Sequence, residues 1–94
     1  MSLEYEVGES PRSLITRGVR ENIPTYLRGK LIRQSQSRHY HPRDALRVEE
    51  VKMITGFFEG ELFPLCASVY PQLNRTKIAR LFNNVVCNPL EQND

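Results

Sequence analysis

Arginine supplies most of the positive charge in this chain, and its placement is the first feature with chemical content. Ten of the thirteen basic residues are arginines, in a chain of 94 residues. Between residues 12 and 47, nine basic side chains face only Glu21 and Asp44, which gives this stretch a net charge of +7. A planar guanidinium forms paired hydrogen bonds with phosphates, carboxylates and base edges. The stretch therefore predicts an anionic partner, with nucleic acid as the first candidate.

Acidic residues lie in other parts of the chain, and they supply the alternative interpretation. Residues 1–11 and residues 48–74 each carry a net charge of −3. The arginines could therefore lie on a solvated face and pair with the acidic middle segment of the same chain, residues 48–74. The candidate nucleic-acid-binding residues are Arg17, Arg20, Arg28, Lys30, Arg33, Arg38, Arg43, Lys77 and Arg80.

The last two of these residues belong to a segment with its own signature. The sequence TKIARLFN, residues 76–83, resembles the first half of a helix-turn-helix motif, which would need a recognition helix directly afterwards. Pro89 interrupts the residues available for that second helix. A continuous apolar stripe through Val85 and Val86 instead favours one amphipathic helix over residues 75–87, with Asn74 as its N-cap. Its polar face would then present Thr76, Lys77, Arg80, Asn83 and Asn84.

Metal binding and catalysis have little support in the sequence. His39, His41, Cys66 and Cys87 offer nitrogen and sulfur ligands, but the paired spacing of a structural zinc site is missing. Adjacent Glu49 and Glu50 would point about 100° apart on a helix and could not act together on one substrate. We therefore expect no metal site, no cofactor and no enzymatic activity, and we expect both cysteines to be reduced and buried.

A run of apolar residues provides the second candidate surface. The segment GFFEGELFPL concentrates Phe57, Phe58, Leu62, Phe63 and Leu65 around two glycines and a proline. If some of these side chains remained outside a small core, they would form a protein interface. The alternative is that all of them fill the core. The interface candidates are Phe57, Phe58, Leu62 and Phe63.

The elements that carry these residues read as helices with short connections. Ser10 and Pro11 begin a helix that ends near residue 21, and Pro24 opens a second helix that fades into a loop at residues 34–43. Asp44 is expected to cap a third helix with Leu46, Met53, Ile54, Phe57 and Phe58 on its apolar face. Pro64 predicts a break or kink near residue 60, before a short helix over residues 64–70.

The sequence thus predicts one all-α domain over residues 1–94, a bundle of about five helices with frayed ends at 1–9 and 90–94. No apolar window approaches the roughly 18 residues of a membrane span. The acidic first residues lack the basic and apolar regions of a secretory signal peptide. We expect an intracellular, cytoplasmic or nuclear, non-enzymatic binding module with an arginine-rich face for nucleic acid. The alternative is a protein-interaction or oligomerisation domain that contacts an acidic partner, a homo-oligomer included, through residues 57–65.

Overall fold

Helices make up the regular secondary structure of the residues that the structure describes. The computed structural model describes residues 3–36 and 42–88, and within these ranges it contains no strand, which confirms the all-α fold class. The elements are α1 (Pro11–Asn22), α2 (Thr25–Gln36), the 3₁₀ turn η1 (Pro42–Asp44), α3 (Val48–Phe57), the π-helical turn η2 (Phe58–Leu62), α4 (Phe63–Val69) and α5 (Arg75–Val86). None of the described helices is long and apolar enough to cross a bilayer.

Helix α1 begins and ends where local sequence signals place it. The Ser10 side chain accepts a hydrogen bond from the Ser13 amide at 3.1 Å, and Pro11 occupies the first helical position, where no amide hydrogen is required. Ile23 leaves the helix with extended dihedral angles because the following proline disfavours the helical region. The Pro24 carbonyl oxygen then accepts from the amides of Leu27 and Arg28, so Pro24 leads directly into α2.

Helix α2 is longer than the sequence predicts. Residues 34–36, expected to belong to a loop, continue the helix to Gln36. The cause is a contact with η1, where the Gln34 side chain donates to the Asp44 carbonyl oxygen and Arg33 pairs with the Asp44 carboxylate at 2.9 Å. The prediction that Asp44 is the N-cap of α3 is therefore wrong, because the Asp44 side chain faces α2. The cap position belongs to Arg47, whose amide donates to Glu50 Oε1 at 2.9 Å.

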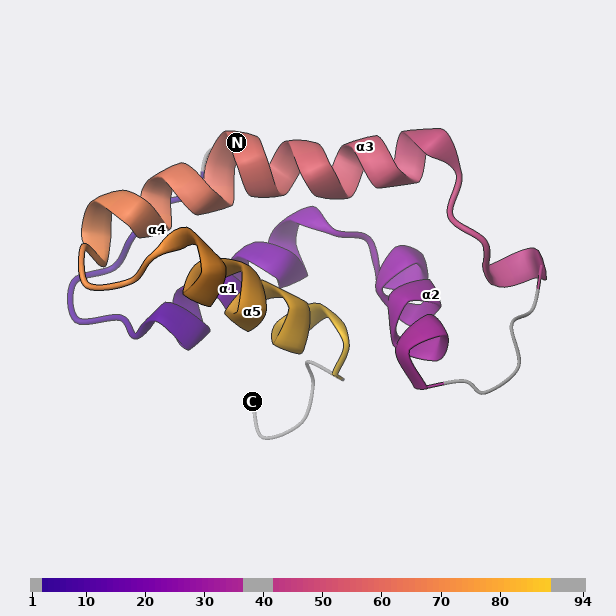
Figure 1. The fold of residues 1–94 in the computed structure, drawn as a ribbon, viewed down its shortest axis with the longest axis horizontal. Coiled ribbons are helices and arrows are strands. Elements are labelled where there is room, and N and C mark those ends of the chain that lie inside the picture. Colours follow the sequence, from indigo (N-terminus) through magenta and orange to yellow (C-terminus); the bar gives the residue numbers. More distant parts are fainter. Residues whose placement is uncertain (1–2, 37–41, 89–94) are drawn as a thin grey trace.

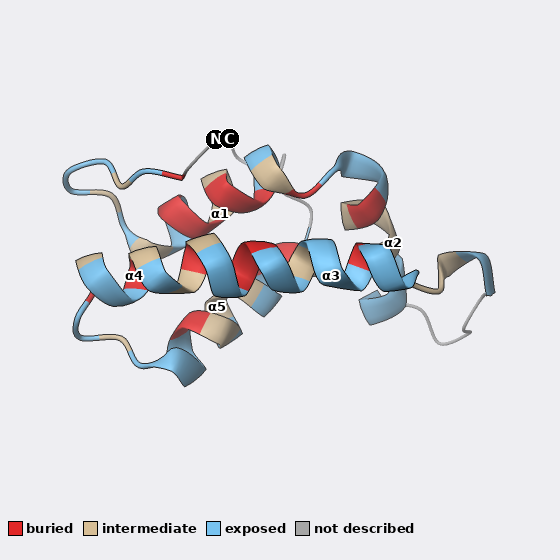
Figure 2. Ribbon diagram, turned by 90° about the horizontal axis from the view of Figure 1, so that it is seen from above, coloured by how far each residue is buried: buried red, intermediate tan, exposed pale blue. Residues whose placement is uncertain are grey.

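Pro64 does not break the helix that follows. Helix α3, η2 and α4 run on as one rod, residues 48–69, which crosses above α1 and α5 (Figures 1 and 2). In a regular α-helix the proline ring would clash with the carbonyl of Gly60. Here the Phe63 amide donates to the Phe58 carbonyl five residues back, so the backbone register changes before the proline. With this rod counted once, the described α-helices form four rods rather than five.

The core lies between this rod and the helices beneath it, and Figure 2 shows its buried residues on the facing sides. The fully buried side chains are Leu14, Ile15, Val19, Ile23, Leu27, Leu62, Cys66, Ile78 and Val85. A Cβ atom on Gly18 would lie only 2.9 Å from Leu3 Cδ2 and 3.0 Å from Phe57 Cζ, so a larger residue there would displace these side chains. Leu3 belongs to the core and Tyr5 packs against it, whereas residues 90–94, which were also expected to be frayed, lie outside the described residues.

Helix α5 is uninterrupted, which confirms the amphipathic-helix interpretation over the helix-turn-helix. Asn74 Oδ1 accepts from the Lys77 amide at 2.8 Å, and the helix then continues to Val86. Ile78, Val85 and Val86 are buried along the stripe. Leu81 and Phe82 are only half-buried, although the Phe82 ring lies 5.0 Å from the Phe58 ring.

Ile78→Ala should lower the free energy of unfolding by about 2–5 kcal/mol, because it removes a fully buried side chain that no neighbour can replace. Urea denaturation followed by circular dichroism measures this loss. Arg80→Ala, on the exposed side of the same helix, is the control and should change stability by no more than about 0.5 kcal/mol. Equal losses in the two variants would contradict the packing described for α5.

Candidate functional site

Arg17 fastens the amino-terminal segment to α1. Its guanidinium donates to both carboxylate oxygens of Glu9, at 2.7 and 3.2 Å, and to the Glu4 carbonyl oxygen at 2.6 Å. The hydrogen bond from Arg17 holds the pKa of Glu9 below its ordinary value, and the same bond raises the pKa of Arg17. Tyr70 on the rod's end donates its hydroxyl to the Glu9 carbonyl oxygen at 2.6 Å. Arg17 is thus engaged within the fold rather than displayed to a partner.

Lys30 and Glu50 form a shielded ion pair between α2 and α3. Lys30 Nζ lies 3.1 and 3.2 Å from the two Glu50 oxygens, and the side chains are only 15% and 5% exposed. In the sequence, Lys30 falls in the middle of an apolar helix face, and the opposing carboxylate is the reason that the position is tolerated. The hydrogen bond from the Arg47 amide is the main cause that lowers the pKa of Glu50, and the hydrogen bond from Lys30 lowers it further.

Two further arginines bind acidic residues of the same chain. Arg33 pairs with Asp44 as described above, and Arg75 pairs with Glu59 on η2. The Arg75 guanidinium also lies over the rings of Phe63 and Phe58, at 4.7 and 5.5 Å from their centroids. Lys30 thus pairs with the acidic middle segment, as the alternative interpretation expects, whereas Arg17 pairs with the amino-terminal segment and Arg33 with Asp44.

The remaining candidates fall into three groups. Arg28 is half-buried on α2 and donates to Thr25 Oγ1 at 2.9 Å. Arg20 on α1 and Arg43 on η1 are exposed, while Arg38 lies outside the described residues, together with His39 and His41. Lys77 and Arg80 are exposed on α5.

The outer face of α5, formed by Thr76, Lys77, Arg80, Asn83 and Asn84, is exposed at every position, as the sequence predicts. No acidic residue occurs anywhere in α5. The acidic residues of 48–62 instead belong to the rod, where Glu50 and Glu59 already pair with basic residues from below. The α5 outer face therefore keeps a positive charge that no acidic residue of its own helix offsets.

The aromatic segment does not form an exposed surface. Phe57, Phe58 and Leu62 lie in the core, and Phe63 is half-buried and stacked 6.1 Å from Phe58. Exposed apolar side chains of the rod lie instead near its amino-terminal end, on α3, where Val48 is 69%, Val51 45% and Met53 39% exposed. Met53 was expected on the buried face. The sequence signal that could have identified this surface is the run VEEVKM, residues 48–53. Its two valines and its methionine do not fall at the buried positions of the helix.

Neither cysteine belongs to a group of side chains that could hold a metal ion in the described part of the chain. No group of three or more His, Cys, Asp or Glu side chains within residues 3–36 and 42–88 is arranged to hold a metal ion. Cys66 is fully buried, and burial raises its pKa to about 11. Cys87 is half-buried, contrary to the expectation of two buried thiols, with Sγ 3.6 Å from Asn83 Oδ1.

Comparisons of the chain with models of known protein families, with curated proteins and with solved structures found no significant match. The functional argument therefore depends on the residues and geometry described above.

Iodoacetamide at pH 8 should modify Cys87 readily and leave Cys66 unmodified while the protein is folded. The thiolate is the form that reacts with iodoacetamide. The raised pKa of Cys66 keeps its thiol protonated at pH 8, and its complete burial keeps the reagent away from the sulfur. Peptide mass spectrometry after timed labelling measures the two rates, and labelling in urea is the control that exposes both cysteines. Equal rates in the folded protein would contradict the packing of α4.

Acid should destabilise the fold in part through Glu50. Its lowered pKa means that the ionised carboxylate contributes stability at neutral pH, and that this contribution is lost as the pH falls below the ordinary value of 4.5. Glu50→Gln should therefore be less stable than the wild type at pH 7 and should lose less stability between pH 5 and pH 3. Urea denaturation across this range tests the difference. Glu49→Gln, the exposed neighbour, should keep the wild-type pH profile.

Proposed function

We propose that this chain is a non-enzymatic binding module that contacts nucleic acid through the α5 outer face. The observation that supports the proposal is an exposed row of Lys77, Arg80 and two asparagines on a continuous helix without acidic residues. Lysine and arginine neutralise phosphates, and arginine and asparagine are the side chains that pair with guanine and adenine edges. A straight helix of twelve residues is also an element of the right width for the major groove.

The internal ion pairs narrow the proposed contact surface. Arg17, Lys30 and Arg33 would have to leave Glu9, Glu50 and Asp44 before they could bind phosphates. Breaking a shielded pair costs more than an exposed contact to phosphate returns, so Arg17 and Lys30 are assigned to the fold, whereas the more exposed Arg33 would leave Asp44 at a smaller cost. Lys77 and Arg80, which are exposed on α5, remain as the candidate phosphate contacts.

A second candidate function is supported by a different surface. The exposed valines and methionine of α3 are typical of a contact with another protein. This version of the protein-interaction hypothesis replaces the aromatic segment, which lies largely in the core, with Val48, Val51 and Met53. Association through such a surface would depend only weakly on salt, whereas binding to phosphates depends on it strongly.

Fluorescence-anisotropy titrations with labelled duplex and single-stranded oligonucleotides should show binding at 50 mM salt that weakens steeply by 200 mM. The variant Lys77→Gln/Arg80→Gln should bind more weakly, and its plot of log affinity against log salt concentration should be shallower by about 1.8 for duplex DNA, because two phosphate contacts are lost.

The matched control is Arg47→Gln/Lys52→Gln, which removes two exposed positive charges from α3 instead. It has the same net charge as the α5 variant and should bind nearly as the wild type does. Absence of wild-type binding at 50 mM salt would refute the proposal. Equal weakening by both variants would show that net charge, rather than the α5 outer face, determines the affinity.

A further inference from the structure

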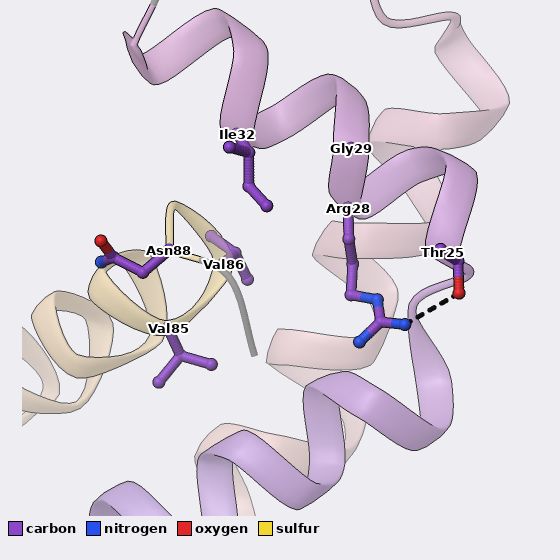
Figure 3. Close-up of a pocket in the computed structure, with 7 residues that line it drawn as sticks. All are labelled: Thr25, Arg28, Gly29, Ile32, Val85, Val86 and Asn88. Carbon is purple, nitrogen blue, oxygen red and sulfur yellow. Dashed lines mark hydrogen bonds between the residues drawn. The ribbon is translucent and has the colours of Figure 1, made fainter. Parts of the chain in front are cut away.

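A small pocket lies between α2 and the carboxyl end of α5. Four residues at helical spacing on α2 (Thr25, Arg28, Gly29 and Ile32) form one wall, and Val85, Val86 and Asn88 form the other (Figure 3). Its volume is about 190 Å³. A cavity of roughly 150 Å³ is enough to hold benzene, so this pocket has room for a ligand of about seven non-hydrogen atoms.

Arg28 gives the pocket a charge without a described counter-ion. Its guanidinium donates to Thr25 Oγ1 at 2.9 Å, while its Nε atom is buried and has no hydrogen-bond acceptor among the described residues. No acidic side chain of residues 3–36 and 42–88 lines the pocket. A shielded cation without an anionic partner is costly, and a carboxylate is the partner that matches a guanidinium in shape and charge.

The carboxyl end of α5 does not serve as that partner. The carbonyl oxygens of Asn83 and Val85 accept from the backbone amides of Cys87 and Asn88, and that of Asn84 accepts from the Asn88 side chain. The partial negative charge at a helix end is about half an elementary charge, which is less than the full positive charge of Arg28. The pocket therefore remains attractive to an anion.

The rest of the lining is apolar. Ile32 extends from the same side of α2 as Arg28, and Val85 and Val86 lie across from it (Figure 3). We propose that this pocket binds a small carboxylate with a short branched apolar chain, the carboxylate on Arg28 and the chain against Ile32, Val85 and Val86. Such a group occurs in free branched-chain acids and at the carboxyl terminus of a peptide that ends in valine. The proposal does not depend on nucleic-acid binding by the α5 outer face.

Titration of the ¹⁵N-labelled chain of 94 residues with 3-methylbutanoate, followed by two-dimensional NMR, tests the proposal. The amides of Thr25, Arg28 and Val86 should shift and saturate, with a Kd on the order of 1 mM. The isosteric neutral amide, 3-methylbutanamide, should bind at least tenfold more weakly to the same wild-type protein. This comparison needs no variant and so does not depend on the folding of a mutant.

Arg28→Met keeps an unbranched side chain of similar length and should weaken binding of the acid at least tenfold. Arg12→Met, an exposed arginine of α1 outside the pocket, is the matched control and should bind as the wild type does. No saturable shifts at these amides, equal binding of acid and amide, or full binding by Arg28→Met would each overturn the proposal.

A second arm separates the two sources of the carboxylate. The peptide acetyl-Gly-Gly-Val, with a free carboxyl terminus, is compared with its carboxyl-terminal amide. Tighter binding of the free peptide than of 3-methylbutanoate would support recognition of a protein carboxyl terminus. Binding of 3-methylbutanoate alone would support a free small acid.

Discussion

The ion pair between Lys30 and Glu50 is the interaction on which the arrangement of α2 and α3 depends. The amino-terminal half of α3 buries little apolar surface, since Val48, Val51 and Met53 face solvent. Glu50 holds this half in two ways, because its carboxylate accepts from the Arg47 amide and pairs with Lys30 on α2. Loss of either partner would leave the other charge shielded and uncompensated. The pair therefore fixes where the rod starts and how α2 lies beneath it.

The same principle explains how a strongly polarised sequence forms a stable fold. The acidic amino-terminal segment is tied to α1 by Arg17, and the acidic rod is tied to α2 and α5 by Lys30 and Arg75. Pairing of this kind uses those basic residues that face the core or the rod. Positive charges that remain for a partner lie on surfaces turned away from the acidic elements. On the α5 outer face, Lys77 and Arg80 are exposed on a helix that contains no acidic residue.

Local signals in the sequence predicted the fold class, the caps at Ser10 and Asn74 and the continuous helix α5, because a cap or a stripe involves residues a few positions apart. They failed where distant residues decide the outcome. Asp44 binds Arg33 instead of capping α3, and the same contact extends α2 to Gln36. The exposed face of α5 was predictable from its periodicity. The partners of Arg17 and Lys30, eight and twenty residues away, were not, because no local pattern specifies which opposite charge a basic residue will meet.

The π-helical turn has a consequence for how the chain tolerates changes in length. Such a turn contains one residue more than the α-helix would use over the same distance, and each residue of an α-helix rotates the side-chain direction by about 100°. Residues beyond η2, with Cys66 and Tyr70 among them, therefore reach the core only because that additional residue is present. Deletion of Gly60, which is exposed and has no side chain, would still rotate the buried side of α4 away from α5. The length of this segment is thus as strictly determined as the identity of its buried residues.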